Sequence, residues 1–184
     1  MANAISPKYL DTDFPLPLTL DDKIEIFADR VRGWQLDIAK QCADNIPHSG
    51  FAVLSIVCNY FEMIAKFKDG YTGESKPRIY FQKGFDDFLS VFPTVEPDLR
   101  EKLIDRMWKG VRCALYHTGI TKGTNLSGDY LVSIEFVEPT GKVHINPHRL
   151  VPDLEKHFEW YVKQLRDSNN QDLRKKFEVR FDYR

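Results

Sequence analysis

Cysteine is scarce in this chain, and the three residues present lie far apart in the sequence. Cys42, Cys58 and Cys113 sit among apolar residues at helical spacing, where cysteine usually behaves as a small hydrophobic side chain. The sequence therefore shows neither a disulfide framework nor the paired cysteines of a zinc site.

Signals for secretion and for membrane insertion are also lacking. Residues 1–19 contain no basic segment followed by the apolar run of about 7–15 residues that a signal peptide needs. No uninterrupted apolar stretch approaches the roughly 18 residues typical of a transmembrane helix. We therefore expect a cytoplasmic protein that does not associate with a membrane.

An excess of charge of one sign is missing as well. The chain has 26 Lys and Arg against 27 Asp and Glu, for a formal net charge of -1, which excludes nucleic-acid binding through global positive charge. With 42% hydrophobic residues, 184 residues are enough for one domain with a single core. Any nucleic-acid site must therefore be a local patch.

Cofactor-binding motifs are absent. The loop from Asp69 to Ser75 contains Tyr71-Thr-Gly-Glu-Ser75 but lacks the Gly-Lys-Ser/Thr ending of a phosphate-binding loop. The sequence also has no dinucleotide fingerprint and no Gly-x-Ser-x-Gly nucleophile elbow. We expect no cofactor.

Apolar residues at steps of three and four predict four helices in the first two thirds of the chain. Thr19 is a suitable N-cap for the first, and Pro97 suits the first turn of the fourth. The second helix is apolar on nearly every side, which indicates a buried central helix and makes its one carboxylate, Glu62, unusual. The expected helices run from 19 to near 47, from 49 to 67, from 81 to 92 and from 97 to near 119.

After Gly123 the pattern changes. Apolar and polar residues alternate over 130–137, a turn with Pro and Gly follows, and 143–145 can return as a hairpin. Pro152 is expected to open a fifth helix, and strict alternation over 177–184 predicts a C-terminal strand.

The predicted fold class is thus mainly α. It is an antiparallel bundle of four to five helices with a small antiparallel sheet, formed by the hairpin and the terminal strand, in the C-terminal third. We divide the chain into an extended, proline-containing arm (1–18), a helical bundle (19–122), and a segment of hairpin, helix and strand (123–184) that packs on the same domain.

The stretch Arg112-Cys-Ala-Leu-Tyr-His117 is the strongest indication of chemistry. Arg112 supplies a permanent cation and His117 a group that exchanges protons near neutral pH, which together suit phosphoryl chemistry. On a straight helix five residues place the two about 140° apart. The pair can therefore meet only if the helix is distorted or if a second subunit completes the site.

The surroundings of this stretch are basic. From Leu99 to Gly123 there are six Lys or Arg against two acids, a local patch that suits phosphate binding. Aromatic side chains there could stack on bases, and Glu62 could orient Arg112 or His117. Two plainer explanations remain open: Arg112 pairs with Asp105 or Glu62, and His117 is an ordinary residue at a helix end. The candidate RNA-binding residues are Arg106, Trp108, Lys109 and Lys122, with Glu62, Cys113 and Tyr116 in supporting positions.

The arrangement resembles the HEPN superfamily, over about Thr19 to Lys122: a buried second helix carries one acid, and a later helix bears Arg-x4-His. Members are often metal-independent ribonucleases, or partners in toxin–antitoxin, defence and RNA-processing systems. The resemblance implies that Arg112 and His117 form an RNA-cleaving site across a homodimer interface. Active members usually have a polar residue after the Arg, whereas this chain has Cys113. The alternative is a non-catalytic dimeric module of the same fold, which binds a cognate partner protein.

The stretch His144-Ile-Asn-Pro-His148, with His157 nearby, is a further candidate for a metal site. Pro147 breaks any regular geometry between the first two histidines, and no carboxylate or cysteine stands at ligand spacing. We expect no metal.

Overall fold

The structure is a computed structural model that describes residues 2–73 and 76–183. Three of the expected segments reach beyond these residues: the arm at Met1, the loop at Glu74 and Ser75, and the terminal strand at Arg184. Those four residues lie outside the described part of the chain.

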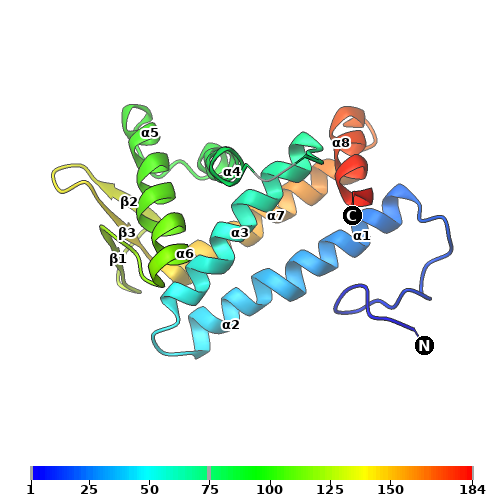
Figure 1. The fold of residues 1–184 in the computed structure, drawn as a ribbon, viewed down its shortest axis with the longest axis horizontal. Coiled ribbons are helices and arrows are strands. Elements are labelled where there is room, and N and C mark those ends of the chain that lie inside the picture. The colour runs from blue at the N-terminus through cyan, green and yellow to red at the C-terminus, as the bar shows by residue number, and fades with distance from the viewer. Residues whose placement is uncertain (1, 74–75, 184) are drawn as a thin grey trace.

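The described residues form six helices and a three-stranded sheet, which confirms a mainly α fold with a small sheet in the C-terminal third (Figure 1). Two of the six are long helices that contain a π-helical segment, labelled η. The elements are α1 (Leu20–Val31), η1 (Arg32–Leu36), α2 (Asp37–Asn45), α3 (Gly50–Asp69), α4 (Pro77–Val91), α5 (Pro97–Arg106), η2 (Met107–Cys113), α6 (Ala114–Thr118), β1 (Thr124–Leu126), β2 (Ile134–Val137), β3 (Lys142–Ile145), α7 (Pro147–Arg166) and α8 (Gln171–Asp182).

The first long helix begins where the sequence predicts. The Thr19 hydroxyl accepts a hydrogen bond from the Asp22 amide, and the Asp22 carboxylate accepts one from the Thr19 amide, so both groups of a capping box are present. After Asn45 the chain turns and returns as α3, antiparallel to the first helix (Figure 1).

Helix α3 is the central helix of the fold. Figure 1 shows it crossing the molecule between the first helix and α4, and eight of its side chains are buried. Among the described helices it is the one that is long and apolar enough to cross a membrane, with a mean hydropathy of 1.3. This length and composition are weak evidence for a membrane span, because the buried core helix of a soluble protein shares them.

The sheet differs from the predicted one. Strands β2 and β3 form the expected antiparallel hairpin, but the third strand is β1, which pairs parallel to β3, so the sheet is mixed with the order β1-β3-β2. The first strand of the hairpin begins at Ile134 rather than at residue 130. The segment 124–126 is too short to show a period of two, so its pairing could not be predicted from its sequence.

The predicted C-terminal strand is wrong, because this segment forms helix α8. Phe177 and Phe181 are four residues apart, so they lie on one face of a helix as well as on one face of a strand. In the structure Phe177 is fully buried, with its ring centroid 5.3 Å from that of Phe27 and 5.6 Å from that of Phe67. A helix satisfies its own backbone hydrogen bonds, whereas a terminal strand would need a free sheet edge beside it.

Helix α7 also begins earlier than predicted. Its N-cap is Asn146, whose side chain accepts a hydrogen bond from the His148 amide at 3.0 Å, and Pro147 takes the first helical position. Pro152, the expected start, lies inside the helix.

A buried polar network joins α3, α4 and α7. The Tyr60 hydroxyl lies 2.7 Å from Nδ1 of His157, whose Nε2 lies 3.1 Å from the carboxylate of Asp87. Lys68 donates to the other carboxylate oxygen of Asp87 at 2.5 Å. Tyr60 and His157 are fully buried, so this network satisfies polar groups that would otherwise be costly in the core.

The network is expected to make stability depend on pH. Burial alone would raise the pKa of Asp87, but hydrogen bonds from His157 and Lys68 outweigh it and lower the pKa below its usual 3.8. A carboxyl group of this kind adds stability above its unfolded pKa and loses it as the pH falls through the folded value. We expect Asp87→Asn to lower the free energy of unfolding at neutral pH, and the difference from wild type to shrink below about pH 4. Urea unfolding at several pH values measures this, and a difference that stays constant down to about pH 3 would contradict it.

Candidate functional site

The candidate site lies on the second long helix, Pro97–Thr118, which ends at Gly119 in the left-handed conformation. Its middle part, η2, is π-helical from Met107 to Cys113 and therefore includes Arg112. Wider turns of this kind are often found at functional sites. The last turn, Ala114–Thr118, is regular α-helix, so the π-helical segment is not the distortion between Arg112 and His117 that the spacing of the motif calls for.

Arg112 is held firmly in place. Its Nε donates to Oε1 of Glu62 at 2.7 Å, and the two side chains are only 20% and 12% exposed. The guanidinium carbon lies 5.0 Å from the centre of the Tyr116 ring and 5.7 Å from that of Trp108, one helical turn away on either side. The ion pair explains why the apolar stretch of α3 carries the carboxylate of Glu62. Of the two expected partners of Arg112, Asp105 and Glu62, the structure shows the pair with Glu62.

A cleft of about 300 Å³ opens beside Arg112. One wall comes from α3 and the other from the end of the long helix. Arg112 is therefore paired but still borders a space that a ligand can enter. The cleft is lined by Ser55, Cys58, Asn59, Arg112, Leu115 and Tyr116.

His117 lies outside this cleft. It is exposed, and its ring makes an edge contact with Tyr116 at 5.1 Å between centroids. No hydrogen bond or ion pair joins His117 to any other described residue, Arg112 included. Tyr116 thus contacts both members of the pair, which do not meet within one chain.

The two thiols near the cleft differ in exposure. Cys113 is partly buried, whereas burial raises the pKa of the Cys58 thiol to about 12, with a smaller opposing effect of Arg112. Cys58 is therefore protonated and unreactive at neutral pH, and it is a buried residue that lines the cleft.

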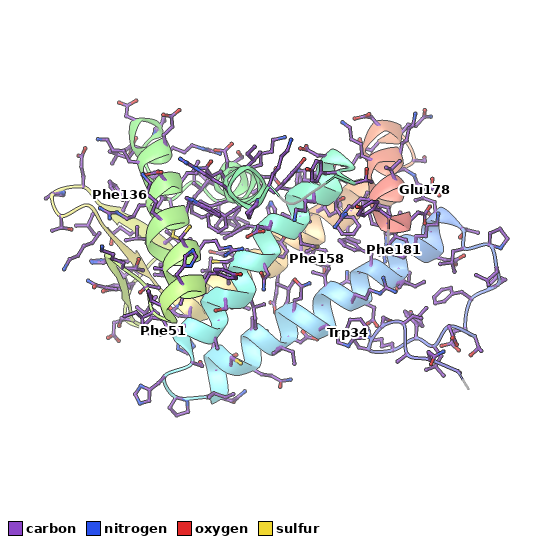
Figure 2. The ribbon with its side chains drawn as sticks, viewed as in Figure 1. Trp34, Phe51, Phe136, Phe158, Glu178 and Phe181 are labelled. Carbon is purple, nitrogen blue, oxygen red and sulfur yellow. The ribbon has the colours of Figure 1, made fainter. Side chains whose placement is uncertain are left out.

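The predicted RNA-binding residues fall on two sides of the helix. Trp108 faces α4, with its ring centroid 5.6 Å from that of Phe81 and 5.7 Å from the guanidinium carbon of Arg112. Arg106 and Lys109 line a separate hollow of about 390 Å³ with Phe136, which Figure 2 places on the sheet side of the helix. Lys109 pairs there with Asp105 at 2.7 Å. Lys122 is exposed and is anchored by its backbone amide, which donates to the Gly110 carbonyl at 2.7 Å.

Ser55 and Asn59 were not predicted from the sequence. With Glu62 they form a line of polar residues at steps of four and three along the apolar helix α3, and such residues lie on one helix face. That spacing is the signal that could have identified the wall of the cleft.

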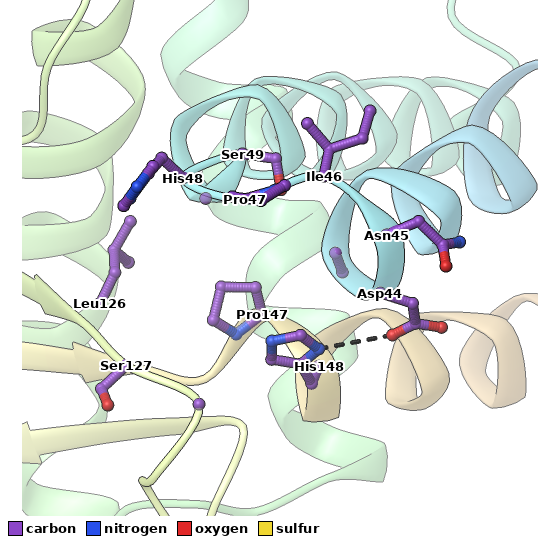
Figure 3. A pocket seen from close by; sticks show the side chains of 13 residues that line it. Asp44, Asn45, Ile46, Pro47, His48, Ser49, Leu126, Ser127, Pro147 and His148 are labelled. Carbon is purple, nitrogen blue, oxygen red and sulfur yellow. Dashed lines mark hydrogen bonds and ion pairs between the residues drawn. The ribbon is translucent and has the colours of Figure 1, made fainter.

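A second cleft, of about 470 Å³, lies where the turn between α2 and α3 meets the start of α7 (Figure 3). In it Nδ1 of His148 lies 3.4 Å from a carboxylate oxygen of Asp44, and His48 stands on the opposite side. The histidine and the carboxylate are each about half exposed, so this is a weak surface pair.

The three histidines of the candidate metal site lie in separate surroundings. His144 stacks on Tyr130 with ring centroids 4.4 Å apart, His148 lies in the second cleft, and His157 is buried in the core. Within residues 2–73 and 76–183, no group of three or more His, Cys, Asp or Glu is arranged to hold a metal ion.

Comparisons of this chain with protein-family models, with curated proteins and with solved structures gave no match.

Proposed function

We propose that this protein is a HEPN-like homodimer that binds RNA and cleaves it without a metal, through Arg112 and His117. One observation carries the proposal: Glu62 fixes Arg112 at the edge of an open cleft, between two aromatic rings, and one of these rings also contacts His117. A fixed cation, a proton-exchanging group and a stacking surface together suit an RNA phosphate and its neighbouring base.

In the proposed reaction the ribose 2′-hydroxyl attacks the adjacent phosphorus and the bond to the 5′-oxygen breaks. The products are a 2′,3′-cyclic phosphate and a 5′-hydroxyl, so water is not consumed. His117 moves a proton, either from the attacking hydroxyl or to the leaving oxygen, and Arg112 stabilises the charge that develops on the phosphate. Glu62 orients Arg112, and Tyr116 supports a base.

A second copy of the chain is part of the proposal, since Arg112 and His117 do not meet within one. The tip of the long helix exposes apolar surface next to His117: Tyr116 is 75% exposed and Ile120 is 57% exposed. Phe51 at the start of α3, which Figure 2 shows near this tip, is 38% exposed. Contact between two such tips would bring His117 of one copy towards the Arg112 cleft of the other.

The alternative function is a non-catalytic dimeric module of the same fold that binds a partner protein. It is favoured by the engagement of Arg112 with Glu62 and by the absence of a polar partner that orients His117 among the described residues.

The test is cleavage of single-stranded and structured RNA in EDTA by wild type and by His117→Ala. We expect wild type to cleave and the variant to be slower by about 100- to 10,000-fold, because general acid–base catalysis contributes that much. The exposed position of His117 means that the variant should fold normally. Equal background cleavage by both proteins would overturn the enzymatic proposal, and that result together with a dimer that persists in both would favour the alternative.

A further inference from the structure

Arg106 differs from the other partly buried arginines of the described chain. Each of those donates to a carboxylate or a carbonyl oxygen, or lies against an aromatic ring: Arg30, Arg32, Arg100, Arg112, Arg174 and Arg180. Arg106 forms no hydrogen bond, ion pair or ring contact with any residue in 2–73 or 76–183. A guanidinium has five N–H donors, and burying donors without an acceptor costs free energy. The donors of Arg106 are therefore available to a ligand.

Two glycine turns border this guanidinium. An added Cβ at Gly141, in the turn between β2 and β3, would lie 3.1 Å from Nη2 of Arg106, and one at Gly123, just before β1, would lie 3.4 Å from Nη1. Both glycines have a left-handed backbone, which other residues rarely adopt. The loop before β1 is fixed to the long helix, because the Lys122 amide donates to the Gly110 carbonyl at 2.7 Å. Backbone segments without side chains thus position the cation.

The hollow of about 390 Å³ beside this guanidinium, called the Arg106 hollow, is basic. Three cations, one carboxylate and one aromatic ring line it: Lys102, Arg106, Lys109, Asp105 and Phe136. The carboxylate of Asp105 is already engaged by Lys109 at 2.7 Å. Lys102 lies 3.3 Å from Glu138, but the two side chains are 60% and 59% exposed, so this pair is weak and Lys102 can turn to a ligand. A local surplus of positive charge on a chain of net charge -1 favours an anion.

A phosphate group matches this set of cations. The planar fork of an arginine binds two phosphate oxygens at once, and a lysine ammonium contacts a phosphate as a point charge. A phosphate also presents more oxygens than a carboxylate, so it can contact the arginine fork and both lysines together. The lining of the hollow therefore favours a phosphate over a carboxylate.

We propose that the Arg106 hollow binds a phosphate group, held by the guanidinium of Arg106 with Lys102 and Lys109 beside it. The inference rests on the proposed RNA-binding function in one respect, that this phosphate belongs to the backbone of the bound RNA. The contact lies apart from the Arg112 cleft, on the sheet side of the long helix. Arg106 then contributes affinity for RNA and takes no part in the cleavage.

The test is the binding of a 2′-fluoro oligo-U of about 12 nucleotides in EDTA, measured by fluorescence anisotropy over a series of salt concentrations. Without a 2′-hydroxyl the strand is not cleaved. Each phosphate contact to a single strand contributes about 0.7 to the slope of log K against log salt. We expect Arg106→Gln to lower this slope by about 0.7 and to bind about 3- to 30-fold more weakly at low salt. Arg106→Lys should keep the slope but lose part of the affinity, because an ammonium lacks the planar fork.

The matched control is Arg180→Gln. Arg180 is also partly buried and forms no ion pair with a described residue, and its guanidinium lies over the rings of Phe67 and Tyr183. It belongs to α8, at the opposite end of the molecule from the sheet (Figure 1). The control removes the same charge as Arg106→Gln, so its slope and affinity should be those of wild type. Equal effects of the two variants would reveal a general effect of charge and overturn the assignment to Arg106.

A calorimetric titration with inorganic phosphate, at constant ionic strength, distinguishes the two sources of the group. We expect wild type to bind phosphate and Arg106→Gln to bind it more weakly. Wild type that binds oligo-U while Arg106→Gln has the same affinity and slope would overturn the contact to RNA and leave RNA binding intact. Failure of wild type to bind oligo-U, with phosphate binding that depends on Arg106, would overturn RNA binding and support a site for a small phosphorylated molecule. Equal binding of phosphate by both proteins would overturn the phosphate site itself.

Discussion

Replacing Arg112 by alanine should both destabilise the protein and remove most of its RNA cleavage. The variant leaves the Glu62 carboxylate, 12% exposed, without its partner at 2.7 Å. Breaking a fully buried ion pair costs about 3–5 kcal/mol, and we expect about 2–4 kcal/mol here because both side chains retain some solvent contact. Loss of a group that stabilises the charged phosphate should lower the cleavage rate by about 100- to 1,000-fold. Urea unfolding and a cleavage assay measure the two effects.

A double variant separates these two effects. In Arg112→Leu/Glu62→Leu no unpaired charge remains in the core, so most of the lost stability should return. Cleavage should stay as low as in Arg112→Ala, because the cation is still missing. A double variant that regains activity with its stability would show that Arg112 acts only in the fold.

Replacing Gly84 by alanine should cause the largest loss of stability. Gly84 in α4 faces α3 so closely that an added Cβ would lie 1.9 Å from the carbonyl oxygen of Phe61. This neighbour is helix backbone and cannot turn aside, so the two helices would have to separate. We expect a loss of more than about 3 kcal/mol, at or above the upper end of typical overpacking, and a melting temperature lower by about 6–12 °C.

The matched control is Gly128→Ala. There an added Cβ would meet only the half-exposed ring of His148, at 3.3 Å, and the backbone is not in the left-handed region. Thermal unfolding should therefore show a change of about 1 kcal/mol or less. An equal, small effect of both substitutions would contradict the close approach of α3 and α4.

Much of the helical fold is predictable because its signals are local. The cap at Thr19 and the apolar period of the following helices fix where the elements begin and which faces they bury. The errors arise where two structures share one pattern. Phe177 and Phe181 suit a strand and a helix equally, and the backbone settles on the helix because it then pairs with itself. The parallel pairing of β1 with β3 is long-range and has no local signal.

The site was predictable in part. A carboxylate in an apolar helix and an arginine in a later one indicated a contact, and Glu62 and Arg112 make it. The π-helical segment could not be predicted, since its residues have the same apolar period as an ordinary helix. The polar wall of Ser55 and Asn59 becomes meaningful only once α3 is known to face the end of the long helix.

The most direct test of the central claim is the chemical nature of the RNA ends left by wild type and by His117→Ala in EDTA. If Arg112 and His117 cleave RNA through the 2′-hydroxyl, wild type leaves 2′,3′-cyclic phosphate and 5′-hydroxyl ends, and the variant leaves almost none. Mass spectrometry of a short synthetic RNA identifies these ends. Products with 5′-phosphate ends, or the same products in equal amounts from the variant, would contradict the account.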